Sequence, residues 1–140
     1  MRYMLDTCIV LHLAIEFDLL NEDVADILRN PENVLCVSAE TGRELVVGFN
    51  NHKFESKKWK TGNDVIKSLE EELNLHILPI DKNVINTYSK LELNEAQEHR
   101  DPSDHIIISH AITAGIPLIT SDRKFPFYTK QGLELIMNSK

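Results

Sequence analysis

The sequence predicts an α/β fold in which a central parallel sheet is covered by helices on both faces. Short continuous apolar runs alternate with segments of helical periodicity, and the connections between them are short. Such runs are typical of strands buried on both faces, and their alternation with helices is typical of a parallel sheet. The sequence has no internal repeat, low-complexity tract or linker, so we interpret residues 1–140 as one domain.

The first apolar run, residues 2–5, ends directly at Asp6 and predicts the first strand. The elements expected up to the middle of the chain follow in order: a helix over residues 8–15, buried on most sides; a helix over 21–28, capped by Asn21 and ended by Asn30 and Pro31; a strand over 34–37; and a helix opened by Ser38 that runs from 39 to about 49.

The second half repeats this alternation after a polar, basic loop at residues 50–62. The expected elements are a helix capped by Asn63 that extends to Leu73, a strand at 76–80, a helix at 84–91 capped by Asp81, a polar connection at 92–100, a helix from Pro102 to Gly115, a strand at 117–120 and an edge strand at 133–137.

Composition and charge exclude several classes of protein. The chain has 42% hydrophobic and 26% charged residues, as a soluble domain with a real core does. No apolar run is long enough to span a bilayer and the N-terminus does not resemble a signal peptide, so we expect a cytoplasmic protein. Cys8 and Cys36 are interpreted as buried small hydrophobes, since no zinc-ligand spacing is present. The net charge of −7 argues against broad, non-specific nucleic-acid binding.

A local basic cluster lies within the predicted loop. Its lysines are interleaved with two aromatic residues, and the members are Lys53, Phe54, Lys57, Lys58, Trp59 and Lys60. One interpretation is contact with a nucleic-acid backbone. The other is a solvated loop in which lysine stems cover apolar surface, and the sequence leaves both open.

Four acids are expected at one edge of the sheet. Asp6 and Asp122 each follow a strand, and the carboxyl ends of parallel strands share an edge. Glu44 lies one to two turns into the helix after the second strand, and Asp104 lies in the first turn of the helix before the fourth strand. Clustered carboxylates repel one another unless a cation is present, and Mg²⁺ and Mn²⁺ prefer oxygen ligands. The sequence therefore predicts a divalent-cation site.

Each acid also has a structural interpretation. Asp6 or Thr7 caps the following helix, and Glu44 completes a capping box with Thr41. Asp104, with Asp101, supplies favourable charge at a helix N-terminus. Asp122 is a turn residue in this alternative.

Four motifs in one order give the chain a resemblance to a known family. They are Met-Leu-Asp-Thr at 4–7, Val-Ser-Ala-x-x-x-x-Glu-Leu at 37–45, Arg-Asp-Pro-x-Asp-x-x-Ile-Ile at 100–108, and Leu-Ile-Thr-Ser-Asp-Arg-x-Phe at 118–125. Together they resemble PIN-domain ribonucleases, and in particular the VapC-type toxins of bacterial toxin–antitoxin pairs. The resemblance implies a three-layer α/β/α sandwich and an Mg²⁺- or Mn²⁺-dependent endoribonuclease whose products end in a 5′-phosphate and a 3′-hydroxyl.

The resemblance also implies roles for individual residues. The metal-site acids are Asp6, Glu44, Asp104 and Asp122; the residues that orient or surround them are Thr7, Asp101, Thr120 and Ser121. Arg43 is a candidate phosphate contact or an ordinary surface arginine. His105 departs from the pattern, since many relatives carry a basic residue at that position.

The implied partners are an RNA substrate, an antitoxin protein and a second copy of the chain. Residues 8–20 carry more apolar side chains than one buried face needs, which is typical of an interface.

Three other functions remain as alternatives: a phosphatase with Asp6 as nucleophile, which would need a second acid where this chain has Cys8; a degenerate PIN domain that only binds protein or RNA; and a phospho-acceptor domain, which would need an adjacent acid pair that this chain lacks. Cleavage of RNA that a chelator abolishes distinguishes the nuclease from all three.

Overall fold

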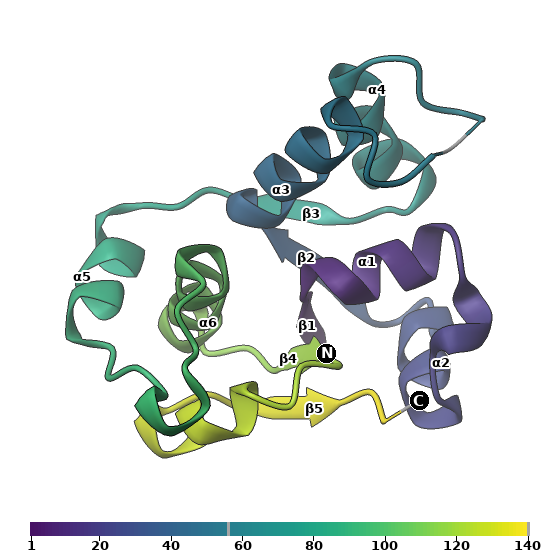
Figure 1. The fold of residues 1–140 in the computed structure, drawn as a ribbon. Coiled ribbons are helices and arrows are strands. Elements are labelled where there is room, and N and C mark those ends of the chain that lie inside the picture. The colour runs from purple at the N-terminus through teal and green to yellow at the C-terminus, as the bar shows by residue number, and fades with distance from the viewer. Residues whose placement is uncertain (56, 140) are drawn as a thin grey trace.

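The structure is a computed structural model and describes residues 1–55 and 57–139. In this part of the chain, five parallel strands form one sheet in the order β3-β2-β1-β4-β5, flanked by helices (Figure 1). This confirms the predicted α/β class. The strands are β1 (Arg2–Leu5), β2 (Val34–Ser38), β3 (His76–Leu78), β4 (Leu118–Thr120) and β5 (Leu135–Met137).

Helices cover both faces of the sheet, with α5 and α6 on one side and α1 and α2 on the other (Figure 1). The α-helices are α1 (Thr7–Ala14), α2 (Glu22–Arg29), α3 (Ala39–Asn50), α4 (Gly62–Lys67), α5 (Lys82–Lys90) and α6 (Pro102–Ala114). Shorter helical turns are η1 (Phe17–Leu19), η2 (Ser68–Glu72), η3 (Glu95–Gln97) and η4 (Phe125–Gln131).

The hydrophobic core has two parts because successive side chains of a strand point to opposite faces. Met4 and Leu118, paired across β1 and β4, are buried against α6 and η4. Leu5 and Ile119, the next pair, are buried against the helices of the opposite face. Full burial of one such side chain stabilises the fold by roughly 1.5–3 kcal/mol, which explains why both faces of these strands carry apolar residues at their centre.

Several predicted helix ends are confirmed. Asn21 caps α2 and Asp81 caps α5, each accepting the backbone N–H of a residue three positions later. Ser38 caps α3, so the capping-box interpretation of Glu44 is wrong. Asp101 caps α6 in front of Pro102.

The cap predicted at Asn63 is wrong. Thr61 is the cap of α4: its hydroxyl accepts the Asp64 N–H at 3.2 Å, and the Asp64 carboxylate accepts the Thr61 N–H at 3.1 Å. Gly62 lies at the first helical position because α4 packs closely on α3, where an added Cβ would lie 2.9 Å from Cγ1 of Val46. The helix also ends at Lys67 and continues to Glu72 only as a π-helical turn.

The helix after β1 is less buried than predicted. Within α1 only Ile9 and Val10 are buried, and Ile15, just beyond its end, is 43% exposed. No helix of the described residues is long and apolar enough to cross a membrane. Cys36 is buried and Cys8 is partly buried, and both are free thiols, as predicted.

Candidate metal-dependent nuclease site

Asp6 and Asp122 lie at the same edge of the sheet, as predicted. Asp6 follows β1 and its backbone N–H donates to the carbonyl of Ile119 at 2.9 Å, which places it beside the end of β4. The backbone N–H of Asp122 donates to the Thr120 hydroxyl at 3.1 Å. The same hydroxyl donates to Oδ2 of Asp6 at 2.6 Å, so Thr120 links the two acids.

Asp6 both caps α1 and lies inside the protein. Its Oδ1 accepts the Thr7 N–H at 2.8 Å, and its side chain is almost fully covered. Burial and, to a smaller extent, the charge of Glu44 raise the pKa of Asp6 to about 6, against the opposing effect of the hydrogen bonds from Thr120 and Thr7. An ordinary capping side chain is exposed to solvent. Burial of a charged Asp6 is therefore unfavourable, and capping alone does not require it.

Glu44 comes to the cluster from the interior of α3. Its Oε1 accepts a 2.6 Å hydrogen bond from the hydroxyl of Thr7, the residue next to Asp6. Thr7 therefore joins β1 and α3 and fixes one oxygen of Glu44, in agreement with the orienting position implied for it.

Asp104 lies in the first turn of α6, and its side chain is only 17% exposed. Burial, together with the charges of the neighbouring acids, raises the pKa of Asp104 to about 8; these acids are Asp6, Asp101, Asp122 and Glu44. The four predicted acids thus come from four separate segments and act on one another electrostatically.

Three other implied residues lie around the acids in different ways. Arg43 is mostly exposed and forms a two-point ion pair with Glu40, at 2.7 and 2.8 Å. Asp101 is bound to the N-terminus of α6 through the Ser103 N–H. The Ser121 hydroxyl accepts a hydrogen bond from Asn138 at 2.9 Å, so its contact is with the end of β5 rather than with an acid.

The structure adds one residue that the sequence did not indicate. Nε2 of His99 lies 2.9 Å from Oδ2 of Asp104, and ligand atoms of His99, Asp104 and Asp122 all lie within 4.8 Å of one another. His99 comes from the polar connection before α6, which has no periodicity to mark it. The one signal in the sequence is that His99 lies five residues before Asp104, the second acid of the Asp-Pro-x-Asp motif.

A groove of about 450 Å³ runs from the acids along α3. Its lining includes Thr7, Glu44 and Asp101 at one end and the basic residue Lys53 and the ring of Phe54 at the other. Its lining carries both signs of charge.

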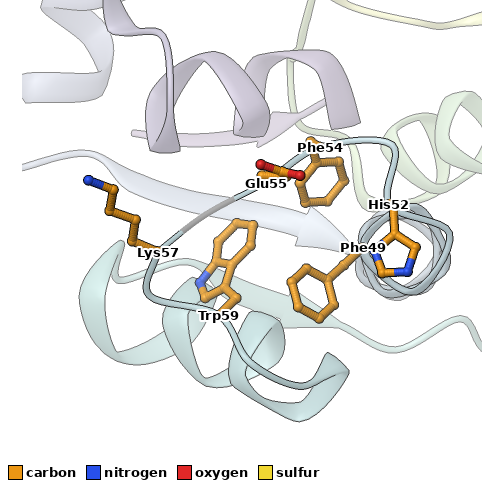
Figure 2. Close-up of a pocket in the computed structure, with 6 residues that line it drawn as sticks. All are labelled: Phe49, His52, Phe54, Glu55, Lys57 and Trp59. Carbon is orange, nitrogen blue, oxygen red and sulfur yellow. The ribbon is translucent and has the colours of Figure 1, made fainter.

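A second hollow, of about 470 Å³, lies beyond Phe54 at the end of α3 (Figure 2). The rings of Phe49, Phe54 and Trp59 contact one another there, with centroids 5.8 to 6.5 Å apart, and Lys57 points away from them. Among the described residues, none of the four acids lines this hollow. The basic cluster is thus built on a buried tryptophan, and contact of its lysines with RNA stays a prediction.

The raised pKa of Asp104 predicts a pH dependence for the metal-free protein. Because the unfolded carboxyl has a pKa near 3.9, the folded state holds a proton that the unfolded state has lost, and stability falls as pH rises toward 8. Burial lowers the pKa values of His99, His105 and His110 below their ordinary value of 6.5, so well above that pH these side chains are neutral in both states. We expect the urea concentration at the unfolding midpoint, measured in EDTA, to decrease as the pH is raised from about 7 to 8. Asp104→Asn should flatten the dependence, and a midpoint that rises would contradict the geometry.

Comparison with known structures finds several that share this fold over nearly their whole length. VapBC2 from Rickettsia felis, bound to a promoter DNA fragment, matches with a TM-score of 0.72 and 24% identity over 98% of each chain. VapBC-1 from nontypeable Haemophilus influenzae matches with a TM-score of 0.70 and 23% identity over 100% of each chain. FitAcB from Neisseria gonorrhoeae matches with a TM-score of 0.65 and 21% identity over 96% of each chain. At these identities the likeness concerns the fold.

A comparison with curated protein sequences finds no match. The family assignment therefore rests on the match between the chain and a family model, together with the order of the sheet and the positions of the acids. The model for the PIN domain covers residues 3–130, which is nearly the whole sequence, and the chain belongs to the PIN-domain family.

Proposed function

We propose that this protein is a metal-dependent endoribonuclease that cleaves RNA phosphodiesters and acts as the VapC-like toxin of a type II toxin–antitoxin pair. The observation that carries the proposal is the convergence of four acids, two that follow β1 and β4 and two that lie in α3 and α6. Burial, together with the charges of the neighbouring acids, raises the pKa of Asp104 to about 8. A protein without a ligand here gains nothing from gathering like charges, whereas a cation-binding site needs them.

The donor set fits Mg²⁺ or Mn²⁺. Both are hard cations that take carboxylate oxygens together with water and phosphate oxygens, and Asp6, Glu44, Asp104 and Asp122 would hold such an ion. When bound, the cation supplies an activated water and charge stabilisation for the leaving oxygen.

The neighbouring residues of the chain prepare these acids. Thr120 and Thr7 each hold one carboxylate oxygen, of Asp6 and Glu44 respectively, at 2.6 Å. Such short charge-assisted hydrogen bonds fix orientation before a ligand arrives. Lys53, at the far end of the groove, is a local cation for the RNA backbone of a protein whose net charge is −7. Arg43 also lines this groove, but its pairing with Glu40 competes with a phosphate contact.

The alternative of a phosphatase with Asp6 as nucleophile has little support. Such an enzyme needs a proton donor two residues on, and burial raises the pKa of the Cys8 thiol to about 12. The alternative of a degenerate binding module leaves the full set of four acids without a purpose.

The proposed partners are a small antitoxin and a second copy of the chain. One similar solved structure is described as a toxin–antitoxin complex from Klebsiella pneumoniae and another as a member of the VapBC family of toxin–antitoxin systems, which supports an antitoxin. Ile15 and Val47 are 43% and 40% exposed, and Val47 lines the groove beside Glu44, so apolar surface is available next to the site. Light scattering of the protein alone tests for the dimer, and light scattering after co-expression with the small protein encoded by the adjacent gene tests for the antitoxin complex. A protein that stays monomeric in both measurements would contradict the two proposed partners.

Binding of Mn²⁺ tests the proposal without any substrate. Because a ligand of the folded state stabilises it by mass action, Mn²⁺ at a hundred times its Kd should add about 2.7 kcal/mol and raise the Tm by several degrees. Thermal shift and titration calorimetry measure this, with Ca²⁺-free buffer and EDTA as the reference. No shift and no heat at millimolar Mn²⁺ would contradict the site.

A further inference from the structure

His99 is buried at the edge of the acid cluster, and only 3% of it is exposed. It lies between two hydrogen-bond partners: Nδ1 is 2.9 Å from the hydroxyl of Tyr128, and Nε2 is 2.9 Å from Oδ2 of Asp104. The ring of His105 packs edge-on against it with centroids 4.7 Å apart. His99 is therefore held on all sides, with one nitrogen aimed at an acid of the site.

The hydrogen bonds determine which nitrogen of His99 carries the proton. The buried Tyr128 hydroxyl accepts the backbone N–H of Asn94 at 3.1 Å. Among the described residues, the only acceptor for the Tyr128 hydroxyl proton is Nδ1 of His99. Buried donors are almost always paired, so Tyr128 donates and Nδ1 accepts. The neutral ring then has its proton on Nε2, which donates to Asp104.

We propose that His99 is a positioning residue for Asp104, and that Tyr128 sets its tautomer. The inference rests on the proposed function, since it assigns His99 to the same metal site. The Nε2–H group holds Oδ2 of Asp104, and Oδ1 has no hydrogen-bond partner among the described residues. One oxygen of the carboxylate is thus fixed by the protein while the other stays available for a cation.

Asp104 needs such a fixing contact more than the other acids do. Thr120 holds Asp6 and Thr7 holds Glu44, whereas His99 supplies the hydrogen bond that holds the Asp104 side chain. Repulsion from the neighbouring carboxylates would otherwise turn the Asp104 side chain away from them. Partners of this kind orient metal ligands, and their loss typically lowers metal affinity or activity by about 10- to 100-fold.

The rival role for His99 is direct coordination through Nε2. A ligating nitrogen must be unprotonated, so the ring proton would have to lie on Nδ1. The Tyr128 hydroxyl proton would then lose its acceptor inside the protein. The two roles therefore require opposite tautomers in the metal-bound protein, and nitrogen NMR in the presence of diamagnetic Mg²⁺ distinguishes them without reference to activity.

The experiment combines that spectrum with Mn²⁺ titrations of five variants. His99→Ala should weaken Mn²⁺ binding by about 10- to 100-fold, and His99→Gln should restore it, because the glutamine amide nitrogen reaches the position of Nε2. Tyr128→Phe should weaken binding in the wild-type background but have no effect on it in the His99→Gln background, where no tautomer is left to set. His110→Ala is the matched control: His110 is buried on α6 and bound to Ser38, so its loss should lower stability and leave Mn²⁺ affinity unchanged.

Each outcome decides the matter. A proton on Nε2, weaker Mn²⁺ binding in His99→Ala and recovery in His99→Gln support the positioning role. Electron spin echo modulation from a directly bound histidine nitrogen in wild-type protein, absent in His99→Gln, overturns it in favour of coordination. Wild-type affinity in a folded His99→Ala variant overturns it and leaves the proposed function intact. A wild-type protein that neither binds Mn²⁺ nor cleaves RNA overturns both.

Discussion

Asp6→Asn is expected to reduce RNA cleavage to the level seen without added metal, while the metal-free protein stays at least as stable as the wild type. The variant keeps the shape of the side chain and its acceptor for the Thr7 N–H, but removes one negative charge that only 5% exposure leaves almost unsolvated. Since burial raises the pKa of Asp6 to about 6, removing the charge relieves strain in the fold. We expect the free energy of unfolding in EDTA to be unchanged or to rise by roughly 1 kcal/mol.

The purely structural interpretation of Asp6 predicts a different pattern. Asparagine caps helices about as well as aspartate, so a mere cap would keep its activity and change little in stability. Asp81 is a control, because it also comes after a strand and caps the next helix through its carboxylate, which accepts the Val84 N–H. Asp81→Asn should cleave RNA like the wild type. Total-RNA cleavage and urea midpoints in EDTA for the three proteins test this, and cleavage retained by Asp6→Asn would remove the basis for the site.

The second large effect is expected at Asp104 rather than at Asp101. Burial and the negative charges of the neighbouring acids both disfavour the ionised form of Asp104, and its pKa is raised to about 8. Asp101 is exposed and bound to the N-terminus of α6. Asp104→Asn should therefore abolish metal-dependent cleavage with stability in EDTA kept or increased, whereas Asp101→Asn should keep most activity. Initial cleavage rates at saturating Mn²⁺ measure the difference, and the opposite ranking would move the metal site by one turn of helix.

The fold and the positions of the four acids were predictable because each depends on local pattern. Asp6 and Asp122 end apolar runs, and a parallel sheet brings the ends of such runs to one edge. Glu44 and Asp104 lie at defined positions of amphipathic or capped helices. Their roles as metal ligands stay a prediction, because proximity and raised pKa values support a site without identifying its ligand.

Other features depend on contacts that the local sequence does not encode. His99 gains its place from Tyr128 and Asp104, which converge only when η4 packs against α6. The cap of α4 was misassigned to Asn63 because Gly62 resembles a loop residue, whereas its missing side chain lets α4 approach Val46 of α3. Trp59 is 7% exposed although lysines surround it in the sequence, since its ring packs with those of two phenylalanines.

The proposed reaction is the hydrolysis of RNA by a water that a bound cation activates, with the cation held by these four acids. The most direct test is to incubate purified wild-type protein with RNA in Mn²⁺, in EDTA, and in EDTA followed by excess Mn²⁺, and to determine the chemical ends of the products. The account predicts cleavage that disappears with EDTA, returns with Mn²⁺, and leaves 5′-phosphate and 3′-hydroxyl ends. Cleavage that persists in EDTA and leaves 2′,3′-cyclic phosphate ends would contradict it, because the attacking group would then be the ribose 2′-hydroxyl.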